Sequence, residues 1–321
     1  MTSVELRRPT FKSPLRLEFG GAFLPVDFGG VERHDNFQAV EVKGRLPLSY
    51  TPRFFGTAFA NPDAVTFSYR YGAAFNHTSV SSLSTGGNDL AIVSPAGPGG
   101  GLGDGVAVND AGIGFANITN LRYSDSYSEQ FFFIGLDFEP WRLSGGGEVA
   151  PYTKAFGGYD RESSTYSGTT ASGGLDFSYH NQIDTSRYGF ELGAKFDQPL
   201  SVISFGHGTS IGVRFSGGVR LVGNHASADS TVAFGGLVNA SESGFAGANR
   251  FDVGGIVNGS FYLQTAGGAT FEAGASYETW KVPTLQYSTD GPMSIDWEAR
   301  DSVTVYGRFI WTFPPETTNP G

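Results

Sequence analysis

The sequence predicts an all-β fold, namely a closed antiparallel transmembrane β-barrel of about twelve strands, within a range of about 10 to 14. Apolar residues recur at every second position over stretches of about ten residues, whereas strands of soluble proteins usually have about five or six. The residues between them are polar or charged, so one face of each strand must be wet. The 321-residue chain has no run of about 18 apolar residues, which excludes a helical membrane span. A soluble β-sandwich shares the alternation but not the strand length, and it is kept as the alternative fold.

The strand that shows this pattern most clearly covers residues 302–313. Val303, Phe309 and Trp311 alternate with mostly polar residues, and the pattern ends at Phe313, before two prolines. About twelve residues at ~3.3 Å each span about 40 Å, and a tilted strand needs only about 9–11 residues to cross a bilayer. Aromatic residues gathered toward one end are typical of the girdle at a membrane interface.

Phe309, Trp311 and Phe313 resemble the closing strand of bacterial outer-membrane β-barrels, which typically ends in Phe after apolar or aromatic residues at alternate positions. The tail 314–321 departs from that family, because the closing strand usually ends the chain. The overall pattern is porin-like and identifies no subfamily. The resemblance implies the outer membrane of a Gram-negative bacterium, contact with outer-membrane lipid, and recognition of Val303 to Phe313 by the barrel-assembly machinery. It also implies short periplasmic turns and long extracellular loops.

The composition excludes several other classes of protein. With 28 Phe, 14 Tyr and 47 Gly but only 16% charged residues, the chain is too aromatic to be disordered. It contains 0 Cys, so disulfides, zinc–thiolate sites and cysteine nucleophiles are absent. Its net charge of -10 argues against nucleic acid as a partner. Residues 1–14 are polar and charged and show no signal peptide, so we expect a mature form in which Met1 replaces a removed leader.

The predicted strands follow one another as alternating segments separated by Gly-, Pro- and Ser-rich breaks. Pro52 and Pro62 favour a turn over 51–63, and a hairpin turn is predicted at Asp184-Thr185-Ser186. In order, the strands cover residues 15–23, 40–50, 64–76, 113–123, 132–138, 149–159, 175–183, 188–196, 211–222, 251–264, 271–280 and 302–313.

The side of the membrane on which each connection lies follows from counting back from a last strand that ends in the periplasm. An even number of strands then places both termini on the periplasmic side. The turn 266–268 falls on that side, and the long polar segments fall outside the cell: 77–111, 223–249 and 282–300. Segment 161–172 conflicts with this scheme, because it is long and polar where a short periplasmic turn is expected. We expect one barrel domain, 15–313, between an N-terminal periplasmic segment, 1–14, and the tail, 314–321.

Charged residues between the apolar ones are predicted to face the lumen. Those predicted to line a pore are Arg16, Glu18, Arg45, Arg70, Glu191, Lys195, Arg214, Arg220, Glu272, Glu278 and Arg308. The alternation also turns Glu41, Lys43, Asp137, Glu139, Asp176 and Asp252 inward. One interpretation is a pore for passive diffusion of small hydrophilic solutes or ions, whose opposed basic and acidic walls resemble the constriction of general porins and predict weak ion selectivity. The alternative is that these charges pair across strands and block a narrow lumen, leaving a barrel that binds a partner through its long loops.

An enzyme is the less favoured alternative. His225 and Ser227 fall on one outward face near the membrane rim, and a base beside a hydroxyl is the arrangement of a hydrolase. The pair resembles the His-x-Ser arrangement of outer-membrane phospholipase A, also a twelve-stranded barrel, but it has no third partner. His180 is predicted to face the lumen beside Asp176 as a polar group. We therefore predict a pore without catalytic residues, metal or cofactor, and the sequence leaves its solute, the state of its lumen and its oligomeric state open.

Overall fold

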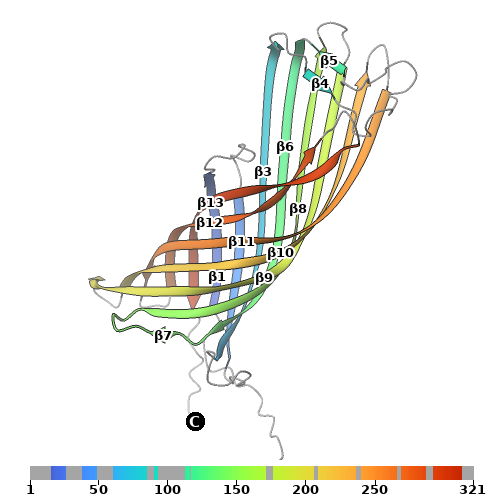
Figure 1. Ribbon diagram of the computed structural model, residues 1–321. Helices are drawn as coiled ribbons and strands as arrows, with labels where there is room; N and C mark the ends of the chain where they lie inside the picture. Colours follow the sequence, from blue (N-terminus) through green and yellow to red (C-terminus); the bar gives the residue numbers. More distant parts are fainter. Residues whose placement is uncertain are drawn as a thin grey trace, which may run out of the picture.

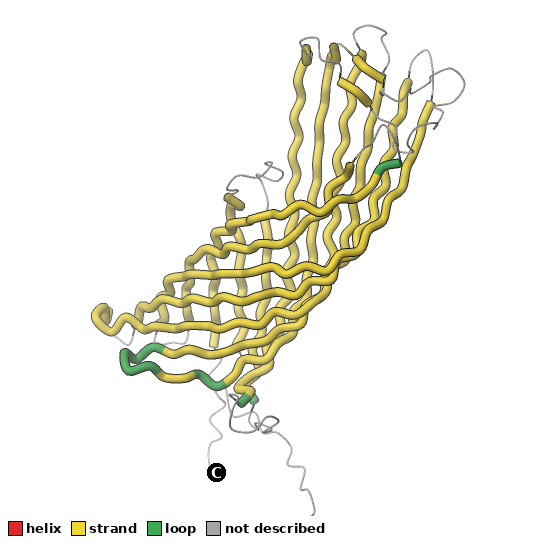
Figure 2. The backbone as a smooth tube through the Cα atoms, viewed as in Figure 1, coloured by secondary structure: helices red, strands yellow, loops and turns green. Residues whose placement is uncertain are grey.

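The computed structural model describes residues 16–26, 38–48, 61–84, 90–92, 113–115, 117–170, 176–205, 209–235, 240–265, 269–286 and 292–312. Side chains are described over most of these segments, but not in 16–26. The described segments are almost entirely β-strand (Figures 1 and 2). Over these segments, no helix has the length and apolar character needed to cross a bilayer.

The strands differ greatly in length, and the longest have more than twice the residues of the shortest main strands. The strands are β1 (Arg16–Val26), β2 (Gln38–Pro47), β3 (Pro62–Ser84), β4 (Leu90–Ile92), β5 (Ile113–Phe115), β6 (Asn117–Phe138), β7 (Trp141–Arg142), β8 (Glu148–Thr170), β9 (Asp176–Phe205), β10 (Thr209–Gly235), β11 (Ala240–Gln264), β12 (Ala269–Gln286) and β13 (Ser294–Thr312).

The main sheet is antiparallel and has 11 strands in the order β6-β3-β2-β1-β13-β12-β11-β10-β9-β8-β7. Strand β8 pairs with β9 on one side and with β6 on the other, so the two ends of this order meet. Setting aside the short β7, which pairs with β8, the other ten strands each pair with two neighbours in a ring. The interior of this ring is called the lumen below.

The ring has ten strands, the lower limit of the predicted range and fewer than the central value of twelve, because two pairs of predicted strands are single strands. Residues 113–123 and 132–138 belong mainly to β6, and the hairpin predicted at Asp184-Thr185-Ser186 is wrong, because β9 continues through it. Removing these two connections also resolves the conflict at 161–172, because its described part, 161–170, is the end of β8 and lies at the same end of the ring as the end of β3. Much of the predicted loop 223–249 is strand as well, since β10 ends at Gly235 and β11 begins at Ala240.

The outward face of the ring carries a band of exposed apolar side chains. On β9 the band contains Tyr188, Phe190 and Leu192, and Phe190 is 60% exposed although it is a large apolar residue. Further toward the start of β9, the outward residues are polar, as at Ser186 and Asp184. Such a band, bounded by polar residues, is typical of a surface that contacts lipid.

Strands β3, β6 and β8–β11 continue beyond the apolar band and form a tall wall on one side of the ring (Figures 1 and 2). On β9 of this wall the polarity of the two faces is inverted. On β9 the inner side chains Phe177 and Ile183 are buried and apolar, while the outward His180 is exposed. The prediction that His180 and Asp176 face the lumen is therefore wrong. Beyond the band, outward residues need not be apolar, because water rather than lipid contacts them. Inward residues need not be polar there, because protein packs against them.

Protein fills the inside because the hairpin of β12 and β13 leaves the ring. The pairing between β11 and β12 ends at Gly255↔Thr279, whereas β12 and β13 stay paired as far as Gln286↔Ser294. We call residues 280–286 of β12 and 294–300 of β13 the hairpin arms. Together with Met293, the arms pack against the inner face of the tall wall: Ile183, Ala228 and Ala246 form one cluster with Met293, Leu285 and Ile295. In Figure 1 these arms cross the tall strands at an angle.

Candidate functional site: the charged lumen

A network of buried ion pairs lies at mid-height in the lumen. Arg220 on β10 donates from Nε to Glu191 on β9 at 2.8 Å and from Nη1 to Glu278 on β12 at 3.0 Å. Lys154 on β8 reaches the same Glu191 at 3.1 Å. The side chains of Arg220, Glu191 and Glu278 are only 6%, 1% and 9% exposed, so these charges are stabilised mainly by one another.

This network extends across the lumen to the other side of the ring. Arg70 on β3 lies 2.6 Å from Glu129 on the neighbouring β6 and 3.5 Å from Glu278 on β12. Strands β3 and β12 are separated by β2, β1 and β13 along the shorter path around the ring. The contact between Arg70 and Glu278 therefore joins two distant parts of the wall.

An aromatic contact joins opposite walls beside the ion pairs. The ring of Trp280 stacks on Phe131, with 6.1 Å between ring centroids. Phe131 is on β6 and Trp280 on β12, and four strands lie between them in either direction around the ring. The guanidinium groups of Arg187 and Arg220 lie 5.0 and 5.7 Å from the centroid of Trp280, where a cation is attracted to an indole face.

These contacts span the lumen from one wall to the other, and we call them the mid-lumen bridge. Its members are Arg70, Glu129, Phe131, Lys154, Glu191, Arg220, Glu278 and Trp280. Side chains from opposite walls are in direct contact there, which narrows the path through the lumen.

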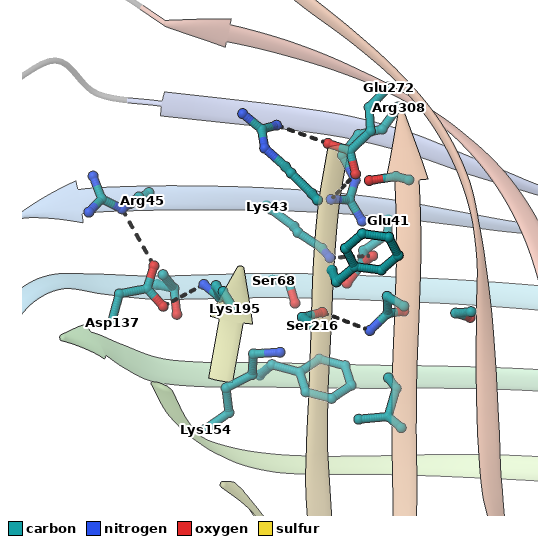
Figure 3. Close-up of a pocket in the computed structure, with 18 of the residues that line it drawn as sticks. Glu41, Lys43, Arg45, Ser68, Asp137, Lys154, Lys195, Ser216, Glu272 and Arg308 are labelled. Atoms are coloured by element: carbon teal, nitrogen blue, oxygen red, sulfur yellow. Dashed lines mark hydrogen bonds and ion pairs between the residues drawn. The ribbon is translucent and has the colours of Figure 1, made fainter. Parts of the chain in front are cut away.

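A cavity of about 500 Å³ adjoins the bridge and extends toward the end of the ring where β13 finishes. Its wall carries a second set of ion pairs: Figure 3 shows Asp137 between Lys195, at 2.5 Å, and Arg45, at 3.5 Å. Arg214 pairs with Asp197 at 2.8 Å and with Glu272 at 3.1 Å. Both signs of charge are thus distributed around the cavity.

The structure brings together most of the residues predicted to line a pore. Arg45, Arg70, Lys195, Arg214, Arg220, Glu272, Glu278 and Arg308 line this cavity, as do Glu41, Lys43 and Asp137. Glu191 lies behind them as a partner of Arg220. The side chains of Arg16 and Glu18 fall outside the described residues, although the backbone of β1 pairs with β2 and β13 at these positions.

The sequence pattern did not identify several residues that make contacts in the lumen. Phe131 and Trp280 occupy inward positions that the sequence pattern assigns to a wet face, and large apolar residues there are the signal that the lumen is filled. Arg187 pairs with Asp160 at 2.6 Å and donates to the backbone oxygen of Lys281 at 3.2 Å, which fixes one hairpin arm to β9. Arg187 follows directly on the wrongly predicted hairpin turn at 184–186. Because that turn interrupts the predicted alternation, the sequence pattern assigned no face to Arg187.

The residues of the hydrolase alternative lie on the outward face, as the sequence predicts, but in a strand. His225 is exposed on β10, and its Nδ1 lies 2.6 Å from Oδ1 of Asn249 on β11. The imidazole is thus oriented by an amide side chain of the neighbouring strand. In the described part of the chain, no group of His, Asp and Glu has the arrangement of a metal site.

Comparison with known proteins gives structural matches only. No protein-family model matches the chain, and no curated protein matches it. The solved structures that it is similar to are bacterial outer-membrane β-barrels. The transport unit of the autotransporter AIDA-I from Escherichia coli has 6% sequence identity and a TM-score of 0.31, with 98% of this chain and 93% of that chain covered. The Pseudomonas putida toluene transporter TodX has 8% sequence identity and a TM-score of 0.24, with 94% of this chain and 90% of that chain covered. The anion-selective porin from Comamonas acidovorans has 9% sequence identity and a TM-score of 0.16, with 93% of this chain and 99% of that chain covered.

Proposed function

We propose that this chain is an outer-membrane β-barrel channel for small hydrophilic solutes or ions, and that the conformation described here is its closed state. The observation that carries the proposal is the charged cavity of about 500 Å³ that ends at the mid-lumen bridge. A wet, charged compartment inside a ring of strands provides a path for hydrated solutes, and the bridge interrupts that path.

The location in the membrane rests on the outward apolar band and on the ring of pairings. Hydrocarbon offers no hydrogen-bond partners, so a sheet can cross it only when each strand edge is paired with a neighbour. The ten strands meet this condition where the ring of pairings is complete, and there lipid would contact residues such as Phe190 and Phe261. We further propose that the barrel-assembly machinery recognises the last strand from Val303, as the resemblance implies; Phe313 lies outside the described residues.

The distribution of charge supports weak ion selectivity. Around the cavity, cations such as Lys195 and Arg214 alternate with anions such as Asp137 and Glu272. Each of these charges has a partner of opposite sign within 3.5 Å, so no single sign dominates the path. A ring of one sign, in contrast, would favour ions of the opposite sign.

The blocked-lumen alternative is favoured by the tall wall. Its outward face presents polar side chains of β8 and β9 above the apolar band, including Arg161, His180 and Gln182. A barrel that only displays such a surface to a partner needs no path through its lumen. We keep this interaction barrel as the second candidate function.

Single-channel conductance of the refolded protein in a planar bilayer separates the two candidates. We expect the wild type to open rarely and briefly, and Trp280→Ala to open more often, because it removes the aromatic contact across the lumen. Trp141→Ala is the matched control, since Trp141 is 57% exposed in β7, at the end of the sheet order. Stable wide openings of the wild type would contradict the closed state. Silence of inserted Trp280→Ala protein would contradict the channel and favour the interaction barrel.

A further inference from the structure

The hairpin arms are the part of the barrel that can move without breaking the ring. They begin where β12 separates from β11, next to Gly254 and Gly255. A side chain at Gly254 would overlap the carbonyl oxygen of Thr279, so glycine allows the close approach at which the two strands diverge. Pro283 lies in the arm of β12, and proline is tolerated there because this part of the strand has lost its β11 partner among the described residues.

The arms are held against the tall wall by apolar contacts and by a hydrogen bond to the backbone. Met293, Leu285 and Ile295 supply apolar contacts to the inner wall, and Arg187 donates to the backbone oxygen of Lys281. The first residue of the arm on β12 is Trp280, which carries the aromatic part of the mid-lumen bridge. Movement of the arms and opening of the bridge are therefore coupled through one residue.

The interface between the arms and the wall leaves buried polar atoms unsatisfied. Both amide atoms of Asn224 on β10 and the hydroxyl of Thr284 on the arm are buried without a hydrogen-bond partner among the described residues. Asn224 lies between Val222, which belongs to a buried cluster packed against Trp280, and Ala228, which packs with Met293. A buried polar group without a partner is costly, and water would satisfy it once the arms leave the wall. The docked state is thus destabilised at the surface that must separate.

We propose that the hairpin arms are the gate of the channel. Docked arms hold Trp280 against Phe131 and close the lumen. Arms that leave the inner wall withdraw Trp280, hydrate Asn224 and Thr284, and connect the cavity to the space enclosed by the tall wall. The apolar contacts of the arms favour the closed state and the unsatisfied polar atoms favour the open state, which makes the element bistable. The term gate rests on the proposed channel function, whereas the movement itself does not.

The absence of cysteine allows a direct test with engineered thiols, because the chain has 0 Cys. The locking pair is Ala246→Cys with Met293→Cys, joined by a short bifunctional thiol reagent that reduction can cleave. The matched control pair is Ala228→Cys with Ala246→Cys, which are directly opposite on β10 and β11 and cross-link within the wall. Ala228→Cys with Met293→Cys is a second locking pair if the first fails to fold.

Two measurements on these proteins separate the gate from the channel. Cross-linking of a locking pair should abolish openings in the bilayer, with recovery on reduction, and should slow hydrogen exchange of the amides in 294–300 at least tenfold. The control pair should change neither. Openings that persist unchanged in the locked protein would overturn the gate and leave the channel intact. Slowed exchange without any openings, locked or reduced, would refute the channel and retain the movement, and unchanged exchange would refute the movement.

Discussion

Arg220→Met is the variant that tests whether the mid-lumen bridge stabilises the barrel. Methionine keeps much of the side-chain volume and removes the charge that Glu191 and Glu278 share, at 2.8 and 3.0 Å. Removing one partner of a buried ion pair typically costs about 3–5 kcal/mol. Each carboxylate here keeps one more cation, Lys154 at 3.1 Å or Arg70 at 3.5 Å, so we expect the lower end of this range. A loss of about 3 kcal/mol corresponds to about a 150-fold change in the unfolding equilibrium.

The assay is urea unfolding in lipid vesicles, followed by tryptophan fluorescence. Arg142→Met is the control, because it removes the same charge from an ion pair with Glu148 at 3.2 Å in which Arg142 is 86% exposed. Exposed pairs contribute about 0–1 kcal/mol, so the control should change the unfolding free energy little. If Arg220→Met costs no more than Arg142→Met, the buried pairs do not hold the walls together, and the account of the bridge is wrong.

Three further predictions concern positions outside the bridge. Gly254→Ala should destabilise the barrel by about 1–3 kcal/mol in the same urea assay, whereas Gly217→Ala should be tolerated, since its new methyl group would lie 3.6 Å from the nearest atom. If Phe190 faces the bilayer core, Phe190→Arg should lower the free energy of unfolding by about 2–4 kcal/mol. Ser178 is exposed on the same strand beyond the apolar band, so Ser178→Arg should be nearly neutral. Equal effects of the two substitutions would refute the membrane position of the band. Burial raises the pKa of Asp184, but hydrogen bonds from Arg161, Tyr159 and Gln182 lower it by more. The pKa of Asp184 therefore lies below its ordinary value of 3.8. The stabilising contribution of its charge is thus present above about pH 3.8 and is lost as the pH falls through the lowered pKa; a carboxyl NMR titration with a midpoint at or above 3.8 would contradict this.

Strand β9 shows how much of the fold the sequence pattern predicts and where it fails. Within the apolar band, Phe190 faces outward and Glu191 faces the lumen, as the alternation predicts. Beyond the band, Ile183 faces inward and polar residues face outward, so the phase of the alternation inverts near Thr185. A turn and a change of surroundings both invert this phase, and the sequence of one strand does not distinguish them. The sequence pattern also split β6 into two predicted strands, and both errors raised the predicted strand number.

The contacts across the lumen could not be predicted from sequence patterns for a different reason. Alternation assigns a face to each side chain, but it does not show that Trp280 meets Phe131 from the opposite wall. That contact depends on the circumference of the ring and on the departure of β12 from β11 at Gly255. Much of the predicted long polar segment 282–300 lies instead in paired strands, including Pro283, which pairs with Trp297.

The lower strand number bears directly on function. A barrel of about eight strands has an interior that side chains alone can fill, whereas barrels of about 16 strands enclose a permanent aqueous channel. The ring of ten described strands is closer to the first case, so one stacked pair of aromatic rings and a few ion pairs reach from wall to wall. A small surplus of space remains as the cavity of about 500 Å³. In a ring of this size a static lumen is closed by default, and a transport function requires a wall element that can withdraw its side chains. The hairpin arms, which carry Trp280 and have already left the ring, meet that requirement.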